Sequence, residues 1–340
     1  MSDAILSARG LVLTFTNHFG GGWRRHLVRA VDEVDVDVHE GETLAIVGES
    51  GSGKSSLARL LLSLIRPTRG TIRYRGELVG GLKGLRRRAY RRDIQAVFQD
   101  PASSLNPRMR VERTLAHVIL EHGLATGATV REIVAEELRA VGLTPAEHYM
   151  ARYPHQMSGG QQQRVAIARA MALKPRLIIA DEPLSSLDIS VQTQILELMA
   201  DLKRKTNVGF VIISHDLGAV QSMADRIAVM YRGRIVEFGN HVLSRPRHPY
   251  TQALVDAKLI ANPRVARARR RIVLPGDAAS APVEGNGCGF RTRCPLVREI
   301  CHAETPALKP ADAGGSLVAC HLVGNADIAV PPGLYRQTPR

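Results

Sequence analysis

A glycine-rich loop between an apolar run and a helical segment is the sequence feature that most restricts the fold. The loop, GESGSGKS, covers residues 48–55; LAIV (44–47) precedes it and SLARLLLSLI (56–65) follows it. A strand, a G-x-x-x-x-G-K-S loop and a helix in this order are typical of a phosphate-binding loop. Its glycines let backbone N–H groups converge on phosphate oxygens, and the helix N-terminus adds its dipole there. The sequence therefore predicts a nucleotide site.

Each residue type in the loop has a separate role. Lys54 reaches the β and γ phosphates of a bound nucleotide, and the hydroxyl of Ser55 is a ligand for Mg²⁺. The residues that we expect to contact the nucleotide in this loop are Gly48, Glu49, Ser50, Gly51, Ser52, Gly53, Lys54, Ser55 and Ser56.

Apolar runs along the chain predict an α/β fold. Four of them alternate with helical segments: LAIV (44–47), IQAVF (94–98), LIIA (177–180) and FVII (210–213). Such runs are typical of parallel strands buried on both faces. Residues 1–40 instead predict short strands around the Gly-rich stretch NHFGGGWRRH, and VDEVDVDV alternates like a strand with one exposed face. We expect a parallel core with an N-terminal antiparallel layer.

Polar side chains follow three of these apolar runs. Asp181 and Glu182 come where LIIA ends, Gln99 follows IQAVF, and His215 follows FVII. Because the carboxyl ends of parallel strands border the ligand crevice, we expect all four near the nucleotide. Asp181 suits Mg²⁺ and Glu182 suits the general base that polarises the attacking water. The sequence thus predicts nucleotide hydrolysis.

The segment MSGGQQQRVAIARAMAL (157–173), here called the signature segment, resembles the signature motif of ABC ATPases. Ser158 can cap a helix, and the next residues expose backbone N–H groups, so this helix end is a second anion site. The predicted contact residues there are Ser158, Gly159, Gly160 and Gln161. The resemblance implies a head-to-tail dimer in which each signature segment covers the nucleotide of the other subunit.

The other motifs of that family follow in order over about residues 5–255. The resemblance implies a Q-loop at Gln99 that also contacts Mg²⁺, a D-loop ending at Asp188, a switch histidine at His215 and an adenine-stacking aromatic at Phe15. Gln99, Glu182 and His215 are then the catalytic residues. It also implies a P-loop NTPase fold with a RecA-like core and a helical signature subdomain at about 100–160.

Within this group the chain is most similar to the ATP-binding subunits of oligopeptide and dipeptide importers. FQDPASSLNPRM (98–109), HPYTQAL (248–254) and a cysteine-containing tail carry the likeness. It implies an ATPase domain at 1–245, an extension at 246–340, and residues 100–107 as the contact with membrane subunits. The implied partners are a second ATPase subunit, identical or paralogous, two membrane permease subunits and, indirectly, an extracytoplasmic binding protein. The implied location is the cytoplasmic face of the cell membrane.

All the cysteines lie in that tail: Cys288, Cys294, Cys301 and Cys320. The N-terminus lacks a secretory leader pattern and no apolar run could span a bilayer, so we expect a reducing compartment, where clustered thiols indicate metal ligands. The spacing C-x5-C-x6-C-x18-C does not identify the metal. The importer resemblance implies a [4Fe–4S] cluster, and a structural Zn²⁺ is the alternative.

The formal charge of +14 leaves a second function open. A soluble ABC ATPase acting on nucleic acid or the ribosome would suit this charge. Repair-type relatives, however, carry a long coiled coil between the phosphate loop and the signature, and translation-type relatives carry two ATPase domains. This chain has neither feature, and a P-loop kinase would have no use for the signature segment. We therefore expect no nucleic-acid partner.

Overall fold

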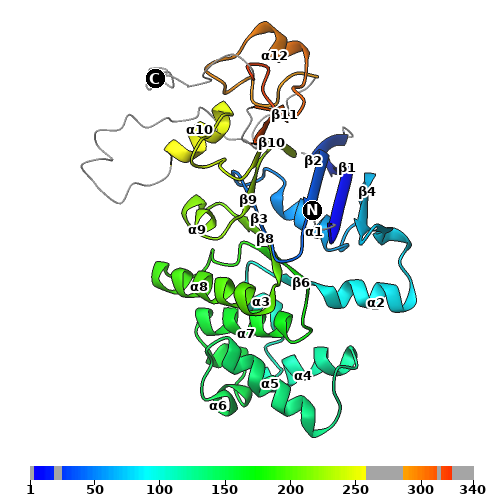
Figure 1. Ribbon diagram of the computed structural model, residues 1–340, viewed down its shortest axis with the longest axis vertical. Coiled ribbons are helices and arrows are strands. Elements are labelled where there is room, and N and C mark those ends of the chain that lie inside the picture. The colour runs from blue at the N-terminus through cyan, green and yellow to red at the C-terminus, as the bar shows by residue number, and fades with distance from the viewer. Residues whose placement is uncertain (1–3, 19–24, 258–285, 312–314, 324–340) are drawn as a thin grey trace, which may run out of the picture.

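Two β-sheets with helices packed around them form the part of the chain that the computed structural model describes, residues 4–18, 25–257, 286–311 and 315–323 (Figure 1). The strands are β1 (Leu6–His18), β2 (Arg25–Val38), β3 (Thr43–Val47), β4 (Arg69–Tyr74), β5 (Glu77–Leu78), β6 (Ile94–Val97), β7 (Leu177–Asp181), β8 (Gly209–Ser214), β9 (Arg226–Tyr231), β10 (Arg234–Gly239), β11 (Lys309–Pro310) and β12 (Leu317–Val318). The α-helices are α1 (Lys54–Leu61), α2 (Gly84–Asp93), α3 (Pro101–Ser104), α4 (Val111–Glu121), α5 (Ala128–Ala140), α6 (Ala146–Met150), α7 (Gly159–Met171), α8 (Ile189–Thr206), α9 (Leu217–Gln221), α10 (Pro249–Asp256) and α12 (Glu299–Ala303). Two short 3₁₀ turns are η1 (Val79–Gly81) and η2 (Pro154–Gln156).

The larger sheet contains all four strands that the apolar runs predict. Its strand order is β11-β12-β10-β9-β3-β8-β7-β6, and the strands from β9 to β6 are mutually parallel. The expectation of a parallel core is correct for this central part. The sheet as a whole is mixed, because β10 and β12 pair in the antiparallel sense and form one edge with β11. Antiparallel edge strands on a parallel sheet are common in α/β folds.

The smaller sheet is the predicted antiparallel layer. Its strand order is β2-β1-β4-β5, and β1 and β2 pair along nearly their full lengths of 13 and 14 residues. They are therefore longer than the short strands expected. In β2, Val34, Val36 and Val38 are buried while Glu33 and Asp35 are exposed, as the alternation predicts. One face of this sheet thus lies on the core.

Each parallel strand of the larger sheet contributes to hydrophobic cores on both faces of the sheet. In β7, Leu177 and Ile179 pack in the core shared with the smaller sheet, whereas Ile178 and Ala180 pack in the core shared with the helices of the lower part of Figure 1. Successive side chains of a strand point to opposite faces, so a strand buried on both faces must be apolar throughout. This is why the run LIIA was recognisable in the sequence.

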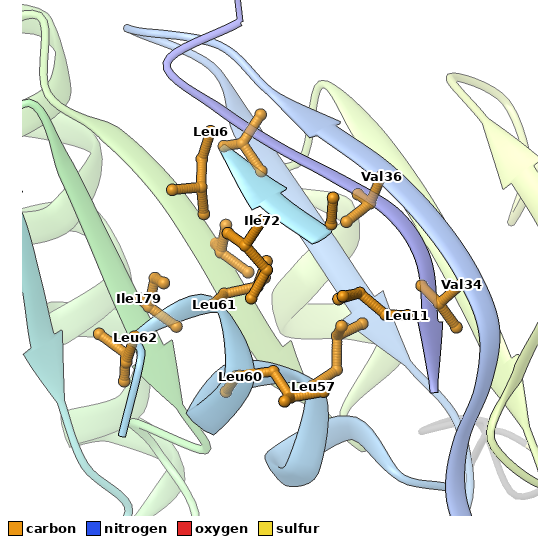
Figure 2. Close-up of a cluster of buried hydrophobic side chains, with 14 of the residues drawn as sticks. Leu6, Leu11, Val34, Val36, Leu57, Leu60, Leu61, Leu62, Ile72 and Ile179 are labelled. Carbon is orange, nitrogen blue, oxygen red and sulfur yellow. The ribbon is translucent and has the colours of Figure 1, made fainter. Parts of the chain in front are cut away.

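Helix α1 fills the space between the two sheets (Figure 2). Leu57, Leu60 and Leu61 on its buried face are fully covered and pack against residues of both sheets, such as Leu11 and Ile179. Spacings of three and four residues place these side chains on one face of a helix. This packing fixes the start of α1 beside the end of β3, where the phosphate loop lies.

The helices α3 to α6 and η2 occupy residues 101–156. They pack with α7 and α8 in a second core. The bounds of the helical subdomain, at about 100–160, stay a prediction.

A third core joins α9, α10 and Phe290 of the tail to the larger sheet. The tail also extends that sheet, since β12 pairs with β10 through Leu317–Phe238 and Val318–Glu237. The division at residue 245 stays a prediction. No helix in the described ranges is long and apolar enough to cross a membrane.

Candidate functional site

The phosphate loop connects the end of β3 to the start of α1, as predicted. Gly53 is the residue before α1 and has a φ of 102°. A Cβ atom there would lie 2.0 Å from the carbonyl oxygen of Ala30, and one on Gly48 would lie 2.2 Å from that of Met230. Both distances are far below van der Waals contact, so only glycine fits at these positions. The backbone of the loop thus packs directly against the backbones of β2 and β9.

Lys54 lies inside this loop. Its Nζ donates hydrogen bonds to the carbonyl oxygens of Gly48 (2.9 Å) and Glu49 (2.7 Å), and the residue is only 4% exposed. Burial lowers the pKa of Lys54 from its usual value, against the attraction of nearby carboxylates, with that of Glu182 the largest. The ammonium group is therefore held on the loop that surrounds it, where a phosphate would be bound.

Ser55 and Asp181 form the next pair of the site. The Ser55 hydroxyl donates to Asp181 Oδ1 at 2.9 Å, which joins the start of α1 to the end of β7. Burial raises the pKa of Asp181, and the hydrogen bond from Ser55 opposes this shift. A hydroxyl and a carboxylate at this distance are oxygen ligands of the kind that Mg²⁺ prefers.

Glu182 lies between the other two predicted strand-end residues. Gln99 Nε2 donates to Glu182 Oε2 at 3.2 Å, and His215 Nδ1 lies 3.4 Å from Glu182 Oε1. Glu182 has a φ of 47°, a backbone conformation that residues other than glycine rarely adopt. Its N–H donates to the carbonyl oxygen of Ile213 on β8 at 2.9 Å, which holds the residue in this conformation. The structure therefore brings the three predicted catalytic side chains together.

The signature segment lies elsewhere in the chain. Ser158 precedes α7 and forms a reciprocal capping box with Gln161: Ser158 Oγ accepts from Gln161 N (3.3 Å) and Gln161 Oε1 accepts from Ser158 N (3.1 Å). Helix α7 contacts α3, α5 and β6, whereas α1 contacts β1, β2, β7 and β8, and Figure 1 shows the two helices well separated. The structure thus does not bring Ser158, Gly159, Gly160 and Gln161 to this chain's own phosphate loop.

Two other predicted residues are exposed. Phe15 lies on β1 opposite Val28 of β2 and is 45% exposed. Ala30, whose carbonyl oxygen approaches Gly53, lies two residues after Val28 on β2. Asp188 precedes α8, and its side chain does not cap that helix. Their contacts with a nucleotide stay predictions.

The four cysteines line one cavity in the tail. His248, Phe290 and His321 share its wall. All four thiols are free, and burial raises the pKa of Cys288 and Cys320 and that of Cys294 to about 12. Among the described residues, however, no three His, Cys, Asp or Glu side chains are grouped as ligands of one metal ion. The thiols therefore share a space without the arrangement that a single ion requires.

The C-terminal part contributes two contacts that the sequence did not reveal. Glu49 N donates to the hydroxyl of Tyr250 (2.9 Å), and Arg293 Nη1 lies 2.9 Å from Glu49 Oε2. Tyr250 belongs to HPYTQAL, whose likeness to the importer family was the only signal in the sequence that could have singled it out. Arg293 belongs to the segment RCP of the cysteine tail, which carries the same likeness, but nothing in the sequence indicated that Glu49 is its partner.

Comparison with known proteins gives consistent results. Residues 31–185 match the family model of the ABC transporter, and residues 236–301 match that of the oligopeptide/dipeptide transporter C-terminal region. A probable peptide ABC transporter ATP-binding protein of Sinorhizobium fredii is 46% identical over 95% of this chain and 91% of its own length. The oligopeptide transport ATP-binding protein AppF of Bacillus subtilis is 45% identical over 87% of this chain and 90% of its own length.

A solved structure shows the same fold. The ATP-binding cassette MJ0796, in a dimeric post-hydrolysis state bound to ADP and Pi, has a TM-score of 0.60 and 27% identity; the alignment covers 69% of this chain and 98% of that one.

Proposed function

The chain belongs to the ATP-binding subunits of the oligopeptide/dipeptide ABC transporter family, and on this premise we propose that it hydrolyses ATP to drive import of peptides through membrane permease subunits. The observation that carries the proposal is the group formed by Gln99, Glu182 and His215 next to the Ser55–Asp181 pair. These five side chains come from the start of α1 and from the ends of β6, β7 and β8, and they meet at the carboxyl edge of the parallel strands, beside the phosphate loop. Such an arrangement suits the in-line attack of water on a terminal phosphate.

In this proposal each group of the site has one task. Lys54 and the N–H groups of the loop bind the phosphates, while Ser55, Asp181 and Gln99 would hold Mg²⁺, which neutralises the charge that develops on the phosphates. Glu182 accepts a proton from the attacking water, and His215 fixes the Glu182 carboxylate through the 3.4 Å contact.

The signature segment and Asp188 would act on the nucleotide of a second ATPase subunit. Support comes from the separation of the signature segment from this chain's loop and from the dimeric state of the MJ0796 cassette. The open N–H groups at the start of α7 then supply a second anion site opposite the phosphate loop of the partner. Phe15 is proposed as the ring that stacks on adenine.

The contact with the permease subunits is proposed at residues 100–107. Asp100 caps the short helix α3 by accepting from Ala102 N (3.0 Å), and Asp100 itself follows Gln99 of the catalytic group. A movement of Gln99 would therefore be passed directly to this surface. The chain would then lie at the cytoplasmic face of the membrane and meet an extracytoplasmic binding protein only through the permeases.

We further propose that Cys288, Cys294, Cys301 and Cys320 hold a [4Fe–4S] cluster rather than one Zn²⁺. Support comes from the cavity that all four line. A cluster would tie together a tail too short to fold by its apolar core alone. Iron and acid-labile sulfide after anaerobic purification would support the cluster, and colourless protein with one zinc per chain would contradict it.

Purification of the tagged chain from detergent-solubilised membranes tests the function. We expect integral membrane subunits to purify with it, and liposomes containing the complex to import labelled peptide only with ATP. Uptake should disappear with Lys54→Ala. A stable complex with DNA or ribosomes that lacks any membrane subunit would contradict the proposal and favour the nucleic-acid alternative.

A further inference from the structure

The phosphate loop is held at Glu49 by residues some 200 positions further along the chain. The Glu49 N–H donates to the Tyr250 hydroxyl at 2.9 Å. Its carboxylate accepts two hydrogen bonds from one guanidinium, Arg293 Nη1 to Oε2 (2.9 Å) and Nη2 to Oε1 (3.2 Å). The backbone and the side chain of one loop residue are thus each bound by the C-terminal part.

The ion pair between Glu49 and Arg293 is largely removed from water. The side chain of Arg293 is 7% exposed and that of Glu49 is 26% exposed. A two-pronged contact between guanidinium and carboxylate is both strong and directional, and poor access to water reduces its screening. Loss of the arginine would therefore leave a carboxylate charge without its partner.

Aromatic packing fixes the position of Arg293. Its guanidinium lies 5.9 Å from the ring centre of Tyr231 and donates to the Tyr231 hydroxyl at 3.4 Å. The Tyr231 ring packs on Tyr250 (4.5 Å between centroids) and on Phe290 (5.3 Å). Arg293 N also donates to the Phe290 carbonyl oxygen at 3.0 Å, which closes a turn. The guanidinium is thus placed in advance of any ligand.

The charge of Glu49 explains why such a contact matters. A carboxylate at the second position of a phosphate loop has the same sign as the phosphates that the loop binds, so an unpaired charge there repels the ligand. Arg293 neutralises it and turns the side chain toward the tail. The Tyr250 hydroxyl meanwhile sets the direction of the Glu49 peptide unit. Both contacts prepare the loop for the phosphate.

We infer that Arg293 is a positioning residue that sets the nucleotide affinity of the phosphate loop through Glu49, and that it takes no part in hydrolysis itself. The inference rests on the proposed ATP site. It makes the C-terminal tail a determinant of nucleotide binding, because Arg293 directly precedes Cys294 in the cavity-lining part of the tail.

The test measures Kd for ADP and kcat for ATP on the purified full chain. Arg293→Gln should raise Kd about tenfold, the size typical of a lost charge-assisted contact, and change kcat at saturating ATP by less than about threefold. The double variant Arg293→Gln with Glu49→Gln should recover most of the affinity, since the repelling charge is gone. A merely structural defect of the tail would not be repaired by a change in the loop.

Two further variants complete the design. Arg298→Gln removes an exposed arginine of the same tail and should leave Kd unchanged. Arg293→Lys keeps the positive charge beside Glu49 and should raise Kd by much less than tenfold, so the charge argument remains testable even if Arg293→Gln does not fold. Wild-type affinity in Arg293→Gln, no recovery in the double variant, or a loss of about tenfold in Arg293→Lys would each overturn the inference. Failure of the wild type to bind nucleotide would instead contradict the proposed function.

Discussion

Glu182 shows at the scale of one residue how the fold fixes a reactive group. Its φ of 47° costs conformational energy, and the hydrogen bond from its N–H to Ile213 on the neighbouring strand compensates for it. Residues in such conformations are concentrated at functional sites. The conformation directs the carboxylate away from the path of β7 and into contact with Gln99 and His215.

A second carboxylate, Glu137 on α5, predicts a pH-dependent stability. Burial raises the pKa of Glu137 from 4.5 to about 7, although Lys174 opposes the shift. Between these pH values the unfolded chain releases a proton that the folded chain retains, so the wild type loses stability as the pH rises. Glu137→Gln stays neutral, so it should be more stable than the wild type by about 3 kcal/mol at pH 8 and nearly equal to it near pH 4.5.

Chemical denaturation of both proteins across this pH range measures the difference. Glu132→Gln, at an exposed position of the same helix, is the control and should give no such pH-dependent gain. An equal effect of Glu137→Gln at pH 4.5 and pH 8 would mean that the carboxyl ionises normally.

Patterns in the sequence predicted most residues of the proposed site. They did not predict the contacts that residues far along the chain make with the phosphate loop. Gln99, Asp181, Glu182 and His215 were predictable because each follows an apolar run, and parallel strands end at one edge. The pairing of Arg293 with Glu49 depends on how the tail packs against β9 and β10. No local pattern reports packing between segments that are far apart in the sequence.

At the scale of elements, the leucines of α1 join the phosphate loop to the core. Leu61 is fully buried between the sheets. Leu61→Ala should lower the free energy of unfolding by about 3 kcal/mol, because it removes buried methyl groups and leaves a cavity.

Thermal or chemical unfolding tests this expectation. Leu64→Ala, just beyond the helix at a position that is 49% exposed, is a matched control that should change stability by less than about 0.5 kcal/mol. Equal losses in the two variants would show that α1 does not support the core as described.

Element prediction succeeded where burial produced a pattern and failed where pairing is not local. The strands β3, β6, β7 and β8 carry apolar side chains on both faces, which makes them visible in the sequence. The antiparallel strand β10 lies outside the predicted runs. The strand β12 has only two residues, so its position depends on pairing with β10, which lies about 80 residues away in the sequence. The lengths of β1 and β2 likewise result from their pairing with each other.

At the scale of the whole molecule, the chain carries two helix starts suited to phosphate that do not meet. The start of α1 carries this chain's own loop, while Ser158 at the start of α7 lies apart from it. A head-to-tail pair of subunits would bring one of each together. In such a pair, each subunit would supply one half of each of two nucleotide sites.

Ser158→Arg separates the two helix starts experimentally. In the isolated chain the substitution should leave nucleotide Kd unchanged, since Ser158 is not part of that chain's own site. In the complex with the partner subunits it should lower the ATPase rate by at least about a hundredfold, because the bulky cation displaces the donors that face the partner's nucleotide. Loss of nucleotide binding by the isolated chain would contradict the head-to-tail arrangement.

We propose that this site binds ATP through Lys54 and hydrolyses it through Glu182. Paired measurement of ATP affinity and single-turnover hydrolysis in the purified complex tests these two roles most directly. Glu182→Gln should bind ATP within about threefold of the wild type and hydrolyse it at least about a hundredfold more slowly, the contribution expected of a general base. Lys54→Ala should weaken ATP binding about tenfold or more, as loss of a charged phosphate contact does. Hydrolysis by Glu182→Gln at the wild-type rate would contradict the account.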